Sequence, residues 1–202
     1  DAHKRAMQAT MPGKYEYEIE AELLYDFRRQ GAQSVAYSSI VAGGANACVL
    51  HYIDNSACLQ SGDLLLIDAG CELDGYAADI TRTFPVNGKF TAVQRDVYGL
   101  VLAAQAAAID QVKPGQDWDA PHQAALRVLC QGFIDLGLCQ GSVDSAIETE
   151  DYKRFYMHRT GHWLGLDVHD AGEYKQAGRW RELLPGMTLT VEPGCYIRPE
   201  KD

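Results

Sequence analysis

The stretch from Gly62 to Phe84 constrains the fold of this chain more than any other. It begins with four consecutive large aliphatic residues, Leu64 to Ile67, which run directly into the carboxylate of Asp68. Such an uninterrupted apolar run is typical of a strand that is buried on both faces. A carboxylate at the end of a buried strand is costly unless it is protonated, paired with a cation or bound to a metal. The sequence therefore predicts a core strand that presents an acidic group to a partner.

A hairpin is expected directly after that strand, because the dipeptide Asp74-Gly75 strongly favours a tight turn between antiparallel strands. A loop of two or four residues there places Asp68 opposite Thr81, with Asp79 as its diagonal neighbour on the same face. Two carboxylates in this arrangement have Cα atoms roughly 7 to 8 Å apart and can converge on shared ions. An odd loop without a bulge would put them on opposite faces. The alternative without a metal is that Asp68 caps the strand end and Asp79 pairs with Arg82.

The composition describes one soluble globular domain, since 47% of the 202 residues are hydrophobic and 23% are charged. No apolar run approaches the roughly 18 residues of a membrane span, and no secretory leader is recognisable at the start. The formal net charge of -10 argues against nucleic-acid and anionic-membrane partners, because phosphate binding needs clustered Lys and Arg. We therefore expect neither kind of partner.

The cysteines are scattered, without a C-x-x-C pair and without the dense spacing of a disulfide framework. The six are Cys48, Cys58, Cys71, Cys130, Cys139 and Cys195. Buried free thiols in a reducing, cytoplasmic setting are the simpler interpretation.

Helical patterns alternate with turn signals along the rest of the chain. Residues 34–52 alternate as strands do, residues 138–156 show no clear period, and a final strand pair is expected around Pro185-Gly186 and Pro193-Gly194. Three apolar helical stripes are predicted. They consist of Ile19, Leu23, Leu24 and Phe27; of Val93, Val97, Leu100, Val101, Ala104 and Ala108; and of Leu126, Leu129, Phe133 and Leu136.

A short internal repeat relates the two ends of the chain. Asp68 lies six residues after one glycine and two before another, and Glu192 has the same spacing. A repeat of this kind predicts two similar halves that each place a carboxylate at the end of a core strand. Coincidence is the alternative, because the match is short.

A cluster of histidines supplies a second group of candidate ligands. Three of the six histidines lie between His158 and His169, and His162 is flanked by Gly161 and Gly165, which permit close backbone approach to a ligand. A lone histidine is more often an ordinary polar residue, but three in a chain with strand-end acids favour a site. Several carboxylates with one imidazole favour Mn²⁺, with Co²⁺ or Zn²⁺ as substitutes. Two adjacent divalent ions would neutralise the acids and share bridging oxygens in a hydrolytic site.

The ordered set of motifs resembles the catalytic domain of the pita-bread metallopeptidases of family M24, and most closely the bacterial Xaa-Pro aminopeptidases. The resemblance covers nearly the whole chain. It implies an α+β fold, with two αβ halves related by a pseudo-twofold axis and a curved antiparallel sheet backed by helices. The motifs that carry it are Asp68, Asp79, His158-x-x-x-His162-x-x-x-x-x-x-His169 and Val191-Glu192-Pro193-Gly194.

The resemblance also implies the members of the site. The ligands of two Mn²⁺ ions would be Asp68, Asp79, His162 and Glu192. The residues that line the pocket and bind the substrate and the tetrahedral intermediate would be His51, His158 and His169. Glu192 would also take part in proton transfer, and for His51 the alternative is an ordinary histidine at a strand end. The two remaining histidines, His3 and His122, are interpreted as structural residues.

Two features of the family are absent from residues 1–202. Family members carry an N-terminal domain, and they have a fifth ligand, a glutamate on the strand after Glu192. We therefore expect residues 1–202 to be a catalytic domain truncated at its C-terminus, with an incomplete second metal site. The full-length protein is expected to be a homo-oligomer.

The implied reaction is hydrolysis of the first peptide bond of peptides that have proline at the second position, with release of the N-terminal residue. A water that bridges the metals would attack the scissile carbonyl. Prolidase, which cleaves Xaa-Pro dipeptides, is the alternative within the fold, and methionine aminopeptidase has a shorter related core. A non-catalytic peptide-binding module is the alternative from another class.

Overall fold

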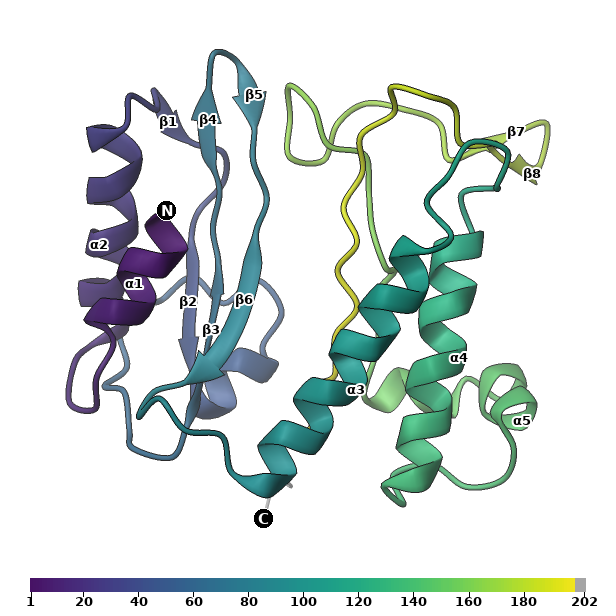
Figure 1. Ribbon diagram of the computed structural model, residues 1–202, viewed down its shortest axis with the longest axis horizontal. Coiled ribbons are helices and arrows are strands. Elements are labelled where there is room, and N and C mark those ends of the chain that lie inside the picture. The colour runs from purple at the N-terminus through teal and green to yellow at the C-terminus, as the bar shows by residue number, and fades with distance from the viewer. Residues whose placement is uncertain (199–202) are drawn as a thin grey trace. The chain divides into compact units, whose positions relative to one another are not determined.

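The computed structural model describes residues 1–198, which form an α+β chain of two compact units (Figure 1). Unit 1 holds Asp1–Ala92 and Leu164–His169, and unit 2 holds Val93–Trp163 and Asp170–Ile197. Among the described residues, no helix is both long enough and apolar enough to cross a membrane.

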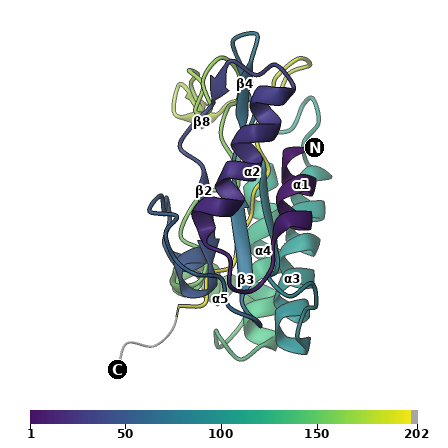
Figure 2. The same cartoon turned by 90° about the vertical axis from the view of Figure 1, so that its left-hand side faces the viewer.

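Unit 1 packs two helices against antiparallel strands, and Figure 2 shows α2 lying over β2. The strand orders are β2-β3-β6 in one sheet and β1-β4-β5 in the other. The helical elements are α1 (Ala2–Ala9), α2 (Glu16–Arg29) and the 3-10 helix η1 (Gly44–Cys48). The strands are β1 (Ser34–Val35), β2 (Ile40–Gly43), β3 (Leu64–Asp68), β4 (Cys71–Leu73), β5 (Tyr76–Ala77) and β6 (Thr81–Pro85).

The core of unit 1 lies between α2 and the aliphatic strand β3. Leu65 and Ile67 are fully buried and belong to the same cluster as Ile19 and Leu23 of α2. The alternate residues of β3 are only half-buried. The strand predicted from the sequence is confirmed, but it is fully buried on one face rather than on both.

The Asp74-Gly75 turn forms as predicted. Leu73 pairs with Tyr76 across it, so the hairpin loop has two residues. Asp74 and Gly75 have φ values of 52° and 81°, and a two-residue turn with both central residues at positive φ matches the right-handed twist of the flanking strands. This turn fixes the register of the two chain segments that it joins.

The register places Asp68 opposite Thr81, as the sequence predicts. Asp79 lies just before β6 in the connection from β5. Between β3 and β4 the chain passes so close to its neighbour that a Cβ atom at Gly70 would lie 1.7 Å from the carbonyl oxygen of Ala78. Glycine is therefore required at that position to keep the two acids on adjoining segments.

Unit 2 is mainly helical, and a small hairpin completes it. A core cluster joins α3 and α4 through residues such as Ala104, Leu129 and Phe133, and a second cluster surrounds Trp118 and Trp163. Residues 138–156, which show no clear period in the sequence, hold the short helix α5 and the 3-10 helix η2. The elements are α3 (Ala92–Ile109), α4 (Ala120–Asp135), α5 (Val143–Glu148), η2 (Asp151–Arg154), β7 (Lys175–Gln176) and β8 (Arg179–Trp180).

Three residues of the predicted apolar stripes are exposed instead. Leu24 is 38% exposed, Val93 is 70% exposed and Leu136 is 42% exposed. Leu24 lies about 100° around α2 from the buried Leu23, whereas Val93 and Leu136 lie at helix ends. A helical pattern read from sequence is weakest at such positions.

The predicted final strand pair around Pro185-Gly186 and Pro193-Gly194 is wrong for the described residues, which form no strand there; Leu189 instead forms an isolated bridge with Trp163. Beyond the bridge, the Glu192 N–H donates to the Thr160 carbonyl at 2.7 Å. The His162 N–H donates to the Thr190 hydroxyl at 2.9 Å instead of to a backbone carbonyl, so the pairing lacks one of the bonds that a regular ladder needs. Residues 160–163 and 189–192 therefore run side by side without becoming a regular ladder.

Phe133 offers a test of the unit 2 core. Its side chain has no exposed surface and its ring packs 5.4 Å from that of Phe155. We expect Phe133→Ala to lower the free energy of unfolding by about 3 to 5 kcal/mol, because the change removes buried contacts and leaves a cavity. Leu136→Ala, on the exposed residue that follows the same helix, should cost less than about 1 kcal/mol. Urea denaturation measures both, and equal losses would contradict the assigned core.

Candidate functional site

Asp68 and Asp79, the two acids predicted to converge, are joined in unit 1 by one phenol. The Tyr37 hydroxyl oxygen lies 2.5 Å from Asp68 Oδ1 and 3.1 Å from Asp79 Oδ1. Tyr37 occupies a bend between β1 and β2, so three separate segments contribute to the group. The prediction that the two carboxylates share one face is confirmed by this common contact.

The surroundings of Tyr37 keep it protonated. Burial, followed by the negative charges of Asp68 and Asp79, raises the pKa of Tyr37 far above its ordinary value. A neutral phenol can donate its hydrogen to only one of the two acids at a time. The carboxylate oxygens of both acids are of the type that binds a divalent cation.

His162 and Glu192 form the second group of candidate ligands, in unit 2. His162 Nε2 lies 3.0 Å from Glu192 Oε1. The other ring nitrogen, Nδ1, lies 2.9 Å from the Trp163 carbonyl oxygen, which can only accept, so Nδ1 carries the hydrogen. In the neutral ring, Nε2 then presents a lone pair toward the carboxylate. Two acceptors that face each other at this distance require a proton or a metal ion between them.

Thr190 organises this second group. Its hydroxyl donates to Glu192 Oε1 at 2.8 Å and accepts the backbone N–H of His162 at 2.9 Å. A Cβ atom at Gly161 would lie 2.1 Å from the Thr190 carbonyl oxygen. The close approach predicted at Gly161 is thus made by backbone. It brings Thr190 within reach of both candidate ligands.

His158 has defined partners on both ring nitrogens. Nδ1 lies 2.8 Å from the Arg159 carbonyl oxygen and Nε2 lies 2.9 Å from the Tyr196 hydroxyl. Because the carbonyl only accepts, His158 Nδ1 donates and Nε2 accepts from Tyr196. The ring also packs edge-to-face against the rings of Tyr156 and Tyr196. His158 is therefore held in one orientation and one tautomer.

The other two predicted pocket histidines lie in unit 1. His51 is exposed in a turn after η1, with a positive φ of 56°. The strand-end position considered for it is wrong, because no strand reaches residue 51. His169 is exposed at the end of the segment Leu164–His169. That segment is attached to the hairpin because Gly165 O accepts the Ala77 N–H at 2.9 Å.

The histidines interpreted as structural have structural partners. His3 Nε2 lies 3.0 Å from the Ala69 carbonyl oxygen. His122 Nδ1 lies 2.8 Å from the Thr160 hydroxyl oxygen, which in turn lies 2.7 Å from the Tyr156 hydroxyl. These contacts support the interpretation from sequence for both residues.

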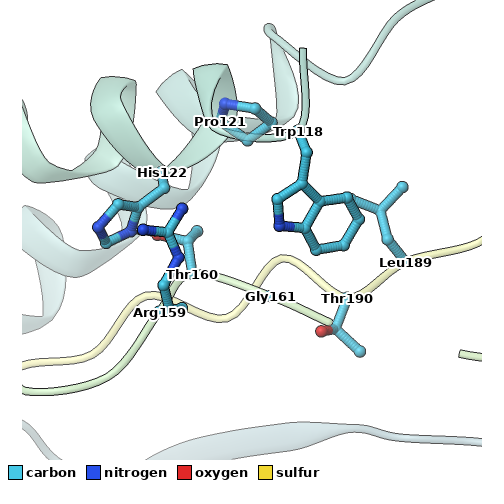
Figure 3. A pocket seen from close by; sticks show the side chains of 8 residues that line it. All are labelled: Trp118, Pro121, His122, Arg159, Thr160, Gly161, Leu189 and Thr190. Atoms are coloured by element: carbon cyan, nitrogen blue, oxygen red, sulfur yellow. The ribbon is translucent and has the colours of Figure 1, made fainter. Parts of the chain in front are cut away.

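Figure 3 shows the small pocket beside His122, on the same two backbone segments that carry His162 and Glu192. Its volume is about 10 Å³, which is room for at most one water molecule. It is lined by Trp118, Pro121, His122, Arg159, Thr160, Gly161, Leu189 and Thr190. This pocket is too small to receive any part of a peptide.

His122 gives the protein a pH-dependent stability. Burial, and then the positive charge of Arg159, lowers the pKa of His122 from 6.5 to about 4. Between pH 6.5 and about pH 4, the His122 imidazole is protonated in the unfolded chain but neutral in the folded chain. The free energy of unfolding should therefore fall by about 3 kcal/mol as the pH drops from 7 to 4. His122→Asn, which can still bond to Thr160, should lose that part of the slope in urea denaturation at several pH values; an unchanged slope would contradict the assignment.

The sequence did not reveal three of the contributors. Thr190 lies two residues before Glu192 in an extended segment, so the period of two along such a segment could have placed both on one face. Tyr37 and Tyr196 carry no such signal. Their roles depend on contacts with residues distant in the sequence.

Each group by itself offers atoms that a divalent ion can bind. Asp68 and Asp79 offer carboxylate oxygens in unit 1, and Glu192 and His162 offer a carboxylate and an imidazole nitrogen in unit 2. Carboxylate oxygens suit Mn²⁺, whereas thiolates are typical of structural zinc.

Comparisons with known proteins point to one family. Residues 1–202 match the family described as Metallopeptidase family M24. The Xaa-Pro aminopeptidase of Haemophilus influenzae is 54% identical over 200 residues, covering 99% of this chain and 46% of that protein. The structure of Pseudomonas aeruginosa aminopeptidase PepP has a TM-score of 0.97 and 58% identity, covering 98% of this chain and 45% of that one. Zinc-substituted Escherichia coli aminopeptidase P in complex with product has a TM-score of 0.95 and 48% identity, with coverages of 98% and 45%. The chain therefore spans slightly less than half of the length of these relatives.

Proposed function

The chain belongs to metallopeptidase family M24, and on this premise we propose that the full-length protein is an Xaa-Pro aminopeptidase. It would hydrolyse the bond between the first residue and a proline at the second position of a peptide. The choice of substrate rests on the similarity to proteins with that activity. The dependence of the reaction on a metal is supported by one observation. The lone pair of His162 Nε2 faces the Glu192 carboxylate, and this arrangement suits a bound cation.

We propose that the ligands are Asp68 and Asp79 from unit 1 with His162 and Glu192 from unit 2, and that they hold two Mn²⁺ ions. Bound divalent ions supply a water of lowered pKa and polarise the scissile carbonyl. A fifth ligand beyond Glu192 would complete the second ion, and residues 199–202 lie outside the described part of the structure.

The chain's own residues orient and protonate the reacting groups. Tyr37, as a neutral phenol, donates to one of the two acids at a time and lies within hydrogen-bond distance of both. Glu192 has one oxygen bonded to Thr190, which leaves the other free to accept a proton from the attacking water and pass it to the leaving nitrogen. His158, with its ring fixed by Tyr196, would contact the substrate together with His51 and His169.

Further parts of the proposal concern the whole protein. Residues 1–202 would be its catalytic domain, with two αβ halves related by a pseudo-twofold axis. The repeated spacing around Asp68 and Glu192 supports that symmetry. We also propose a homo-oligomer located in the cytoplasm, where the six free cysteines would stay reduced.

Product analysis by mass spectrometry tests the activity. The full-length, Mn²⁺-loaded protein is offered Ala-Pro-Ala, Ala-Pro and the control Ala-Ala-Ala. Release of alanine from Ala-Pro-Ala alone is the expected result. Cleavage of Ala-Pro alone would replace the proposal by a prolidase. A folded, metal-loaded sample that cuts none of the three would leave a peptide-binding module as the better account.

A further inference from the structure

The carboxylate of Glu16 is the most deeply buried charged group in the described part of the chain. Glu16 is the first residue of α2, and its side chain has no exposed surface. A carboxylate survives such burial only when hydrogen bonds replace its water. Its partners therefore show what the group does.

All four donors to Glu16 come from one segment, residues 43–57. Oε1 accepts the Gly43 N–H at 2.8 Å and Asn46 Nδ2 at 3.1 Å. Oε2 accepts the Tyr52 hydroxyl at 2.7 Å and the Ala57 N–H at 2.8 Å. The Glu16 N–H donates in return to the Ala57 carbonyl oxygen at 3.0 Å. One side chain thus fixes the beginning, the middle and the end of the segment.

The middle of this segment carries His51. Its φ of 56° lies in the left-handed region, which is uncommon for a residue other than glycine. Tyr52, the next residue, is bonded to Glu16, and Asn46 Nδ2 lies 3.1 Å from the Tyr52 hydroxyl. The Val49 N–H closes the turn by donating to the Asn46 carbonyl oxygen at 2.9 Å. The conformation at His51 is therefore bounded on both sides by groups that Glu16 holds.

We infer that Glu16 is a positioning residue that acts through His51. It holds residues 43–57 in the conformation that presents the His51 imidazole to the substrate. The effect on turnover rests on the proposed function, whereas the effect on the segment does not. In this role, Glu16 need not contact the substrate or a metal ion.

Glu16→Gln tests the inference, because glutamine keeps the shape but turns one acceptor oxygen into an NH₂ group that faces donors. Hydrogen exchange should accelerate about tenfold or more in peptides from residues 43–57 and stay unchanged in α4. Glu18→Gln is the matched control. It removes the same charge from the same helical turn, where Glu18 Oε2 accepts the Tyr15 N–H at 2.8 Å.

A double-mutant cycle in the full-length, Mn²⁺-loaded protein separates positioning from general stability. Glu16→Gln should lower kcat/KM for Ala-Pro-Ala about tenfold when His51 is present. In a His51→Ala background, Glu16→Gln should lower kcat/KM by less than about twofold, because Glu16 acts through His51. Equal losses in both backgrounds, or unchanged exchange in residues 43–57, would overturn the inference. If the wild-type protein cleaves no such peptide, the proposed function is wrong and the exchange result alone decides the role of Glu16.

Discussion

Asp79→Ala is expected to lower kcat/KM for Ala-Pro-Ala at least about 1,000-fold in the full-length protein. A metal ion contributes several kcal/mol to the stability of the transition state, and each 1.4 kcal/mol is a factor of ten in rate. Removing Asp79 takes away a ligand and leaves Asp68 as the only acid bonded to Tyr37. Steady-state kinetics with added Mn²⁺ measures the loss, and metal analysis should show fewer bound ions per chain.

Glu72→Ala is the control for Asp79→Ala. Glu72 lies on β4 of the same unit, where Oε2 accepts the Ser34 hydroxyl at 3.3 Å, so its removal takes away a negative charge but no proposed ligand. We expect less than about a twofold change in kcat/KM. A binding module would behave differently, since Asp79→Ala would leave its affinity for peptides nearly intact. Retained turnover in Asp79→Ala would refute the assigned ligand.

Glu192→Gln should be as damaging, although it preserves the shape of the side chain. The amide oxygen can still accept from Thr190, so the local fold should survive. The variant loses the negative charge that binds a cation and the group that would transfer the proton, and the expected loss in kcat is about 1,000-fold or more. Single-turnover kinetics at saturating Mn²⁺ distinguishes a slow chemical step from weak metal binding.

Glu182→Gln provides the matched change within unit 2. Glu182 is exposed, and its replacement removes one carboxylate charge without altering any proposed ligand. Its kcat should stay within about twofold of the wild type. If Glu182→Gln and Glu192→Gln lose activity equally, the loss reflects the net charge of the unit rather than a ligand.

The part of the fold around the acids was predictable because local chemistry determines it. The Asp74-Gly75 dipeptide specifies a two-residue turn, and that turn alone sets Asp68 opposite Thr81. The apolar run before Asp68 likewise specifies a strand. The predicted convergence of Asp68 and Asp79 therefore needed no information from distant parts of the chain.

The remaining contributors could not be found in this way, because their roles arise from tertiary contacts. Tyr37 reaches Asp68 from a bend, and Glu16 bonds to a segment that begins 27 positions later, at Gly43. A strand was predicted near Glu192, but the His162 N–H bonds to the Thr190 hydroxyl instead of a backbone carbonyl, so only an isolated bridge forms there. Val93 and Leu136 were predicted to be buried but are exposed. Both lie at helix ends, and the sequence determines helix boundaries less well than helix interiors.

Anomalous diffraction at the manganese edge, from crystals of the full-length protein grown with Mn²⁺, tests the central claim most directly. The account predicts two manganese peaks whose ligands include Asp68, Asp79, His162 and Glu192. Crystals of Asp79→Ala should lose or weaken at least one of them. Ordered crystals of active protein with no manganese bound to these four residues, or with manganese bound elsewhere, would contradict the account.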